Sequence, residues 1–158
     1  MRHTDRSKLA IADGGFMRLT QFTDYGLRVL MRLAGAPAQT MTTEILSSEF
    51  GISRHHLVKV VAALAAAGFI ETQRGAGGGI RLARPAARIR LGDVVREMEG
   101  DQALVECFRA DGGACVLTPS CRLKGRLAEA RQAFVAALNR STLADCAVEP
   151  RLVLEELR

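Results

Sequence analysis

The chain has 158 residues, 48% hydrophobic and 25% charged, and this ordinary globular usage excludes wholesale disorder. The length suits one domain, or a small domain with a dimerisation appendage. Lys and Arg outnumber Asp and Glu by 22 to 17, a net charge of +5. Residues 1–100 hold 14 basic and 9 acidic side chains, and residues 101–158 hold 8 of each. This distribution indicates a basic module that binds a polyanion, followed by a neutral part with a different partner.

The sequence predicts neither a membrane span nor a signal peptide. The longest unbroken apolar run, Val60–Ala67, is far short of the ~20 residues that a spanning helix needs. We therefore expect a cytoplasmic protein whose four cysteines stay reduced and act as ligands or redox groups. Residues 1–16 are polar without a clear period and predict a flexible extension, or a start upstream of a true start at Met17.

Three helices are expected in the first half. Thr23 is the expected cap of the first, which ends at Gly35-Ala36-Pro37, and a second fits Thr43–Phe50 with Thr42 or Thr43 as its cap. Gly51 makes a tight turn, and Ser53 caps a third helix that Gly68 ends. The apolar positions of this third helix follow the 3.6-residue period: Leu57, Val60, Val61 and Leu64.

A glycine-rich connection then joins two expected strands, Phe69–Gln73 and Ile80–Ala83. Helix, helix, turn, capped helix and ribbon in this order predict a winged helix-turn-helix over residues 17–100, with the helix-turn-helix at about 43–67 and the wing at 69–83. The fold class is therefore mainly α, a winged helix-turn-helix domain with a two-stranded wing plus a long C-terminal dimerisation helix.

The remaining elements follow the wing. Ile89–Glu99 predicts an amphipathic helix opening near Gly92, and residues 101–121 form a cysteine-bearing loop. Residues 121–147 form the dimerisation region, with a long helix over Cys121–Leu138 and a shorter one around Leu143–Cys146, and residues 148–158 form a tail. The long helix carries one apolar stripe: Leu123, Leu127, Ala130, Phe134 and Leu138.

The third helix carries the expected DNA-reading residues at its N-terminal end. Polar side chains there reach base edges or phosphates while the opposite face packs on the domain: Ser53, Arg54, His55, His56 and Lys59. Arg74 at the wing tip is a candidate for the minor groove, and Gly75 and Gly77 let the backbone approach phosphates closely. The glycines lack the Gly-x-x-x-x-Gly-Lys-Ser/Thr pattern, so no nucleotide site is expected.

Three cysteines, Cys107, Cys115 and Cys121, lie in one loop and at the start of the next helix. Three converging thiolates suit a soft metal or an iron–sulfur cluster with an oxygen donor as further ligand, although three unrelated structural thiols remain an alternative. Cys146 lies on an apolar face and reads as a small buried hydrophobe. Both internal histidines belong to the expected DNA-reading helix and Cys-x-x-Cys is absent, so we expect no enzyme and no thiol oxidoreductase.

Four segments together resemble the winged-helix family of iron–sulfur regulators that includes IscR, and within it the NsrR-like nitric-oxide-sensing repressors. They are Met17–Arg28, Arg74–Gly79 with its glycines, Ile89–Arg96, and Cys121-Arg122-Leu123. The resemblance covers about residues 17–145. It implies a cytoplasmic repressor that releases double-stranded operator DNA when nitric oxide attacks the cluster.

The resemblance also implies the ligands and the assembly. The chain would form a homodimer, and each protomer would hold a 2Fe-2S or 4Fe-4S cluster on Cys107, Cys115 and Cys121, with Asp24 of the partner subunit as a weak, displaceable ligand. The gap between the first two cysteines, seven residues, is longer than the family's usual gap, and Asp111-Gly112-Gly113 should bulge. The alternatives are a regulator of iron–sulfur assembly or redox balance and, in another class, a zinc or thiol redox protein that binds no DNA.

Overall fold

The computed structural model describes residues 18–148 except Ala76 and Asp101, so the expected extension at 1–16 and all but the first residue of the expected tail lie outside the described residues. Its helices and strands are α1 (Gln21–Ala34), α2 (Thr43–Phe50), α3 (Arg54–Ala66), β1 (Ile70–Gln73), β2 (Gly79–Leu82), α4 (Leu91–Glu99) and α5 (Arg122–Leu138). Short 3-10 helices add η1 (Ala86–Arg88), η2 (Glu106–Phe108), η3 (Thr118–Ser120) and η4 (Leu143–Cys146). The mainly α winged-helix fold is thereby confirmed.

Side-chain caps fix where the first three helices begin. Thr20, not Thr23, caps α1: the hydroxyl of Thr20 accepts the N–H of Thr23 at 3.2 Å. The prediction of Thr23 as the cap was wrong because Thr23 is fully buried inside the first turn. Thr42 caps α2, and Gly51 ends it in the left-handed conformation at φ +62°. Ser53 caps α3 as predicted, accepting the N–H of His56 at 3.4 Å.

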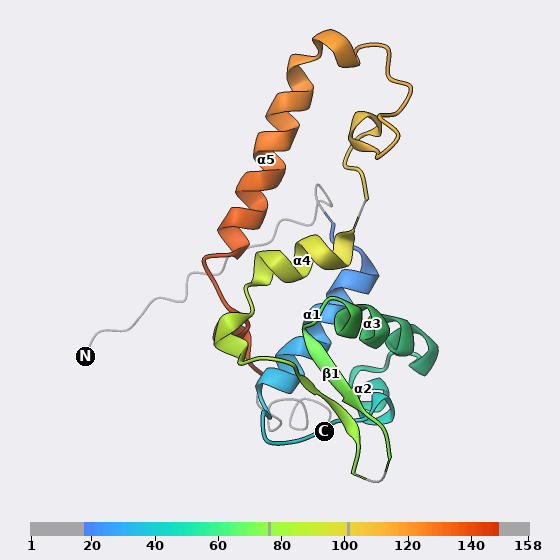
Figure 1. Cartoon of the computed structure of the whole chain (residues 1–158), viewed down its shortest axis with the longest axis vertical. Helices are drawn as coiled ribbons and strands as arrows, with labels where there is room; N and C mark the ends of the chain where they lie inside the picture. Colours follow the sequence, from blue (N-terminus) through green and yellow to red (C-terminus); the bar gives the residue numbers. More distant parts are fainter. Residues whose placement is uncertain (1–17, 76, 101, 149–158) are drawn as a thin grey trace, which may run out of the picture.

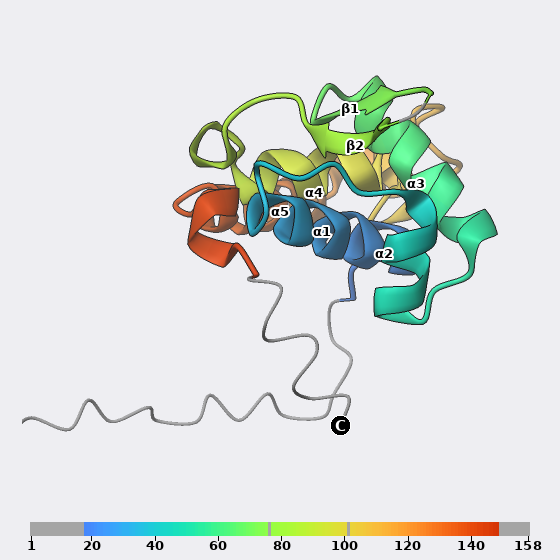
Figure 2. The ribbon, with the colours of Figure 1, turned by 90° about the horizontal axis from the view of Figure 1, so that it is seen from below.

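The core lies between α1, α2, α3 and the wing (Figures 1 and 2). β1 and β2 pair antiparallel, with Ile70 opposite Leu82, and α3 packs against β1. Arg32 of α1 is only 6% exposed and donates two hydrogen bonds to Glu49 of α2, at 2.8 and 3.0 Å. The largest fully buried hydrophobic side chains come from the three helices, from the residue before β1, from the C-cap residue that follows η1, and from η4: Leu30, Leu33, Leu46, Leu57, Leu64, Phe69, Ile89 and Leu143.

Helix α4 joins this body to α5. The side chain of Asn139, just after α5, caps α4: the Asp93 N–H donates to Asn139 Oδ1 at 3.0 Å, and Asn139 Nδ2 donates to Asp93 Oδ1 at 3.2 Å. A methyl group on Gly92 would lie 2.3 Å from the carbonyl oxygen of Val135. Gly92 is therefore required for the close approach of the two helices.

Helix α5 rises away from the body, and the cysteine-bearing loop lies beside it (Figure 1). Within the described residues α5 buries none of its side chains, and Leu123 of its apolar stripe is 61% exposed. After α5 the chain returns to the body, where Leu143 is fully buried and the N–H of Val148 donates to the carbonyl of Met31 at 3.2 Å. In the described ranges no helix has the length and apolar character to cross a membrane.

Candidate nucleic-acid interface and cysteine loop

The structure presents all the expected DNA-reading residues of α3 to solvent. Ser53, Arg54, His55, His56 and Lys59 are exposed, while the opposite side of the helix is buried in the core. This division follows from the helical period, which turns the apolar positions inward and leaves the polar start of the helix free.

Arg54 forms an ion pair at that surface. Its Nε lies 2.7 Å from Oε1 of Glu44, in the first turn of α2, and both side chains are largely exposed. A hydrogen bond from the backbone N–H of Glu44 itself, followed by the charge of Arg54, holds the pKa of Glu44 below its ordinary value. Glu44 is therefore charged at neutral pH, and Arg54 must exchange this carboxylate for a phosphate or base edge when it contacts DNA.

The wing places Arg74 at an exposed tip. Gly75 and Gly77 have φ of +99° and +77°, which L-residues rarely adopt, and Gly78 donates its N–H to the carbonyl of Gly75 at 2.9 Å. A methyl group on Gly78 would lie 2.3 Å from the carbonyl oxygen of Gln73. The tight turn itself therefore requires glycine at these positions. Because glycine has no side chain, the backbone of the turn is also left uncovered.

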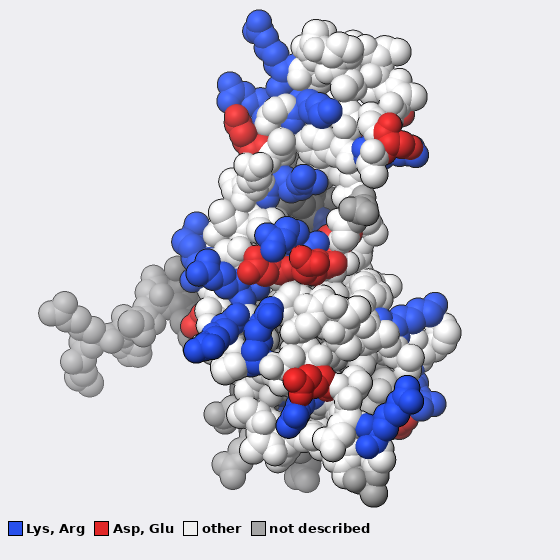
Figure 3. All heavy atoms as spheres, viewed as in Figure 1, with Lys and Arg blue, Asp and Glu red and all other residues white. Residues whose placement is uncertain are grey.

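Basic side chains spread over the whole face drawn in Figure 3, with acidic groups between them, and do not gather into one patch there. Some of the basic side chains have an acidic partner: Arg81 on the wing pairs with Glu71 across the two strands at 2.9 Å.

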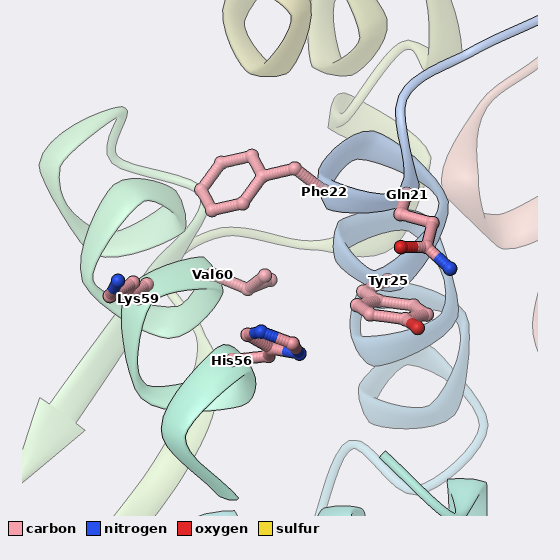
Figure 4. A pocket seen from close by; sticks show the side chains of 6 residues that line it. All are labelled: Gln21, Phe22, Tyr25, His56, Lys59 and Val60. Carbon is pink, nitrogen blue, oxygen red and sulfur yellow. The ribbon is translucent and has the colours of Figure 1, made fainter. Parts of the chain in front are cut away.

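A small hollow separates the first turns of α1 from the start of α3. The hollow has a volume of about 190 Å³, and Figure 4 shows the side chains that line it. Phe22 extends from α1 toward α3, His56 and Val60 extend from α3 toward α1, and Tyr25 lines the hollow from α1. The end of α3 that carries its polar residues thus borders a hollow that it shares with α1.

The seven-residue gap between the first two cysteines closes on itself. The N–H of Ala114 donates to Oε1 of Glu106 at 3.1 Å, so the residues immediately before Cys115 and Cys107 are hydrogen-bonded to each other. The segment between them turns back through two left-handed glycines, Gly112 and Gly113, and a methyl group on Gly113 would lie 2.5 Å from the carbonyl oxygen of Glu106. Cys107 and Cys115 therefore follow the two residues whose hydrogen bond closes this turn.

Cys121 occupies the cap position of α5, and the loop is also tied to that helix. The guanidinium of Arg131 lies 5.2 Å from the ring centre of Phe108, the neighbour of Cys107. All three cysteines are half-buried. The prediction that Cys146 is buried was wrong, because it too is half-buried, in η4.

Three thiols on one loop are donors of the kind that an iron–sulfur cluster requires, so the donor chemistry fits. Across residues 18–148, apart from Ala76 and Asp101, no three His, Cys, Asp or Glu side chains are grouped closely enough to hold one metal ion. A single protomer therefore carries the donors without bringing them together.

Asp24 lies in the first turn of α1 and is engaged elsewhere. Its Oδ2 lies 2.7 Å from Nη2 of Arg28 one turn further along the helix, and about half of each side chain is exposed. The carboxylate is thus accessible to a second molecule, at the cost of a surface ion pair that contributes little by itself.

Sequence reasoning missed three residues that shape these sites: Glu44, Asn139 and Glu99. Glu44 and Asn139 act on residues remote in sequence, so no local spacing reveals them. Glu99 accepts hydrogen bonds from Thr20. Recognising Thr20 as the cap of α1 would have directed attention to this region of the molecule.

The capped α3, the turn before it and the wing define a winged-helix DNA-binding protein. The model of the Rrf2 family, described as iron-dependent transcriptional regulators, matches residues 19–149, and the chain belongs to this family. It is therefore a transcriptional regulator and not an enzyme, as expected. This membership contradicts the alternative of a redox protein without DNA binding.

Individual relatives agree with this family. The chain is 49% identical over 142 residues to the HTH-type transcriptional regulator NsrR of Geobacillus kaustophilus (strain HTA426), covering 89% of this chain and 96% of the relative. CymR, the global cysteine regulator of B. subtilis, has a similar structure, with a TM-score of 0.66, 28% identity, and coverage of 83% of this chain and 96% of CymR. The T. potens IscR structure has a TM-score of 0.65 at 22% identity over 90% of each chain, a likeness of fold alone.

Proposed function

We propose that this chain is a cytoplasmic iron–sulfur-cluster repressor that senses nitric oxide and releases double-stranded operator DNA in response. The observation that carries the proposal is the pairing of an exposed DNA-reading helix with a separate loop that holds Cys107, Cys115 and Cys121. The 49% identity to NsrR supports the choice of signal.

In this proposal the three thiolates and Asp24 of the partner subunit hold one 2Fe-2S or 4Fe-4S cluster in each protomer. A bound cluster supplies iron that nitric oxide binds strongly. Asp24 would be the weakest ligand of the set, because hard oxygen donors suit iron–sulfur chemistry less well than thiolates do. A carboxylate of Asp24 not bound to a cluster would pair with Arg28, since both side chains lie on one face of α1.

The proposed assembly is a homodimer built on α5. An amphipathic helix with no buried residue, whose Leu123 is 61% exposed, leaves an apolar stripe to be covered. Covering it with the α5 of a second copy would give two recognition helices related by a two-fold axis. Such a dimer should read half-sites about 10 bp apart, centre to centre.

Iron and acid-labile sulfide analysis of anaerobically purified protein tests the ligand assignment. Single Cys→Ser changes at positions 107, 115 and 121 should each abolish the visible absorption of a cluster, whereas Cys146→Ser should retain it. Asp24→Ala should allow a cluster to form that is less stable, because three thiolates remain. Protein with no bound iron and sulfide, or with a cluster that survives Cys121→Ser, would contradict the assignment.

DNA binding has a separate test. If a dimer neutralises around six phosphates, the log–log slope of affinity against salt should be roughly −5. A chain that shows no salt-dependent binding to any duplex, even when reconstituted with iron and sulfide, would refute the DNA-binding half of the proposal.

A further inference from the structure

Glu99 connects the cysteine loop to the first turn of α1. It is the last residue of α4, and its Oε1 accepts two hydrogen bonds from Thr20, the backbone N–H at 2.9 Å and the hydroxyl at 3.1 Å. The two residues are 79 positions apart and half-buried, and bonds to a carboxylate are stronger than bonds between neutral groups. Gly100 follows at φ +55° and ψ −139°, a conformation that favours glycine, and the N–H of Gln102 in the loop donates to the carbonyl of Glu99 at 3.3 Å.

Thr20, which Glu99 holds, is in turn hydrogen-bonded to the first turn of α1. Its single hydroxyl proton goes to Glu99, so its oxygen is left to accept from the N–H of Thr23 at 3.2 Å and the hydroxyl of Thr23 at 3.0 Å. The carbonyl of Thr20 accepts the N–H of Asp24 at 3.0 Å. The hydrogen bonds from the N–H groups of Thr23 and Asp24 thus both go to a residue that Glu99 holds.

The same turns of α1 face the DNA-reading end of α3. Phe22 and Tyr25 of α1 and His56 and Val60 of α3 line the hollow of about 190 Å³ (Figure 4). The first turns of α1 and the polar end of α3 therefore border the same hollow. Farther along, the buried Arg32 of α1 pairs with the half-buried Glu49 of α2, and this pair holds that part of α1 against α2.

We propose that Glu99 is a positioning residue that transmits a change in the cysteine loop to the first turn of α1, and from there to the polar end of α3. The inference rests on the proposed function, because the cluster is what changes the loop. Replacing Glu99 should leave the cysteine loop and α3 folded, but a change in the loop should no longer affect α3.

The first experiment needs no cluster. In a Cys146→Ser background, iodoacetamide alkylates the three half-buried loop thiols, and hydrogen exchange of the amides of Thr23 and Asp24 is followed by mass spectrometry. We expect alkylation to speed their exchange at least threefold. In Glu99→Ala exchange should already be fast and unchanged by alkylation, and Glu99→Gln, which keeps an acceptor oxygen, should restore part of the response. Glu97→Ala, an exposed position on the same helix, is the control and should behave like the unaltered chain.

The second experiment measures coupling. A duplex that the chain itself selects from a random-sequence pool is titrated with cluster-loaded and cluster-free protein, and the ratio of the two Kd values is the readout. Glu99→Ala should bring this ratio at least tenfold closer to one, whereas Glu97→Ala should leave it unchanged. A merely structural role would weaken both states alike and keep the ratio.

The outcomes separate the two proposals. If Glu99→Ala retains the full ratio, the positioning role is overturned and the proposed function stands. If the unaltered chain itself shows a ratio of one, the proposed function fails and hydrogen exchange alone decides the role of Glu99. Exchange at Thr23 and Asp24 that ignores alkylation, or responds equally in Glu99→Ala, would overturn it.

Discussion

Replacing Glu44 by Gln should strengthen DNA binding. Glu44 is ionised at neutral pH and lies 2.7 Å from Arg54, so it neutralises a guanidinium at the start of the recognition helix and brings a negative charge toward the phosphates. The amide keeps the size of the side chain and removes the charge. Arg54 then becomes free to neutralise one further phosphate, and the log–log slope of affinity against salt should steepen by about 0.9 for each protomer.

The slope sets the size of the effect. One extra phosphate contact in each protomer, two for a dimer, means that the advantage of Glu44→Gln over the unaltered chain shrinks about twelvefold when salt is raised from ~50 to ~200 mM. Fluorescence anisotropy of a labelled duplex over that range measures it. Glu129→Gln is the matched control, because Glu129 pairs with Arg126 at 3.2 Å on exposed α5, away from α3, and should change nothing.

Weaker binding by Glu44→Gln at every salt concentration would refute this reasoning. It would mean that the carboxylate of Glu44 orients Arg54 for DNA contact, so that the guanidinium is no longer held in one position when the carboxylate is removed. An unchanged slope would show that Arg54 makes no phosphate contact.

Three further changes test other parts of the molecule. Arg74→Ala should weaken binding to a selected duplex more than binding to non-specific DNA if the wing tip enters a narrow minor groove, with no change in melting temperature; equal losses on both would reassign Arg74 to a phosphate. Glu49→Ala should lower the free energy of unfolding by about 3 kcal/mol, because it leaves Arg32 buried without its partner, and a urea transition shifted by less than a third of that would contradict the importance of the pair. Gly92→Ala should cost about 2 kcal/mol, since its methyl group would meet the backbone of α5, whereas Gly125→Ala, with open space around it, should be neutral or stabilising.

Local signals in the sequence were enough to predict the helix-turn-helix. The predicted bounds of α2 are those observed, and Ser53 caps α3, because threonine, glycine and serine act on neighbours within a few residues. The same rule failed at α1, where Thr20 and Thr23 both satisfy it. Burial decides between them, and burial depends on the packing of the whole domain.

Long-range contacts account for the rest. Nothing in the spacing of Glu44 and Arg54, or of Asp93 and Asn139, indicates that they meet, because their contact depends on how helices pack. The expected bulge between Cys107 and Cys115 is confirmed as a closed turn, but the hydrogen bond that closes it belongs to Glu106, which carried no signal.

The central claim is that a cluster on the cysteine loop controls DNA binding. Anaerobic titration of the cluster-loaded protein with nitric oxide, with Kd for a selected duplex followed at fixed salt, tests it most directly. We predict tight binding by the loaded protein, a rise in Kd of at least tenfold as nitric oxide is added, and no response in Cys121→Ser. Equal Kd values for loaded, nitric-oxide-treated and cluster-free protein would contradict the claim.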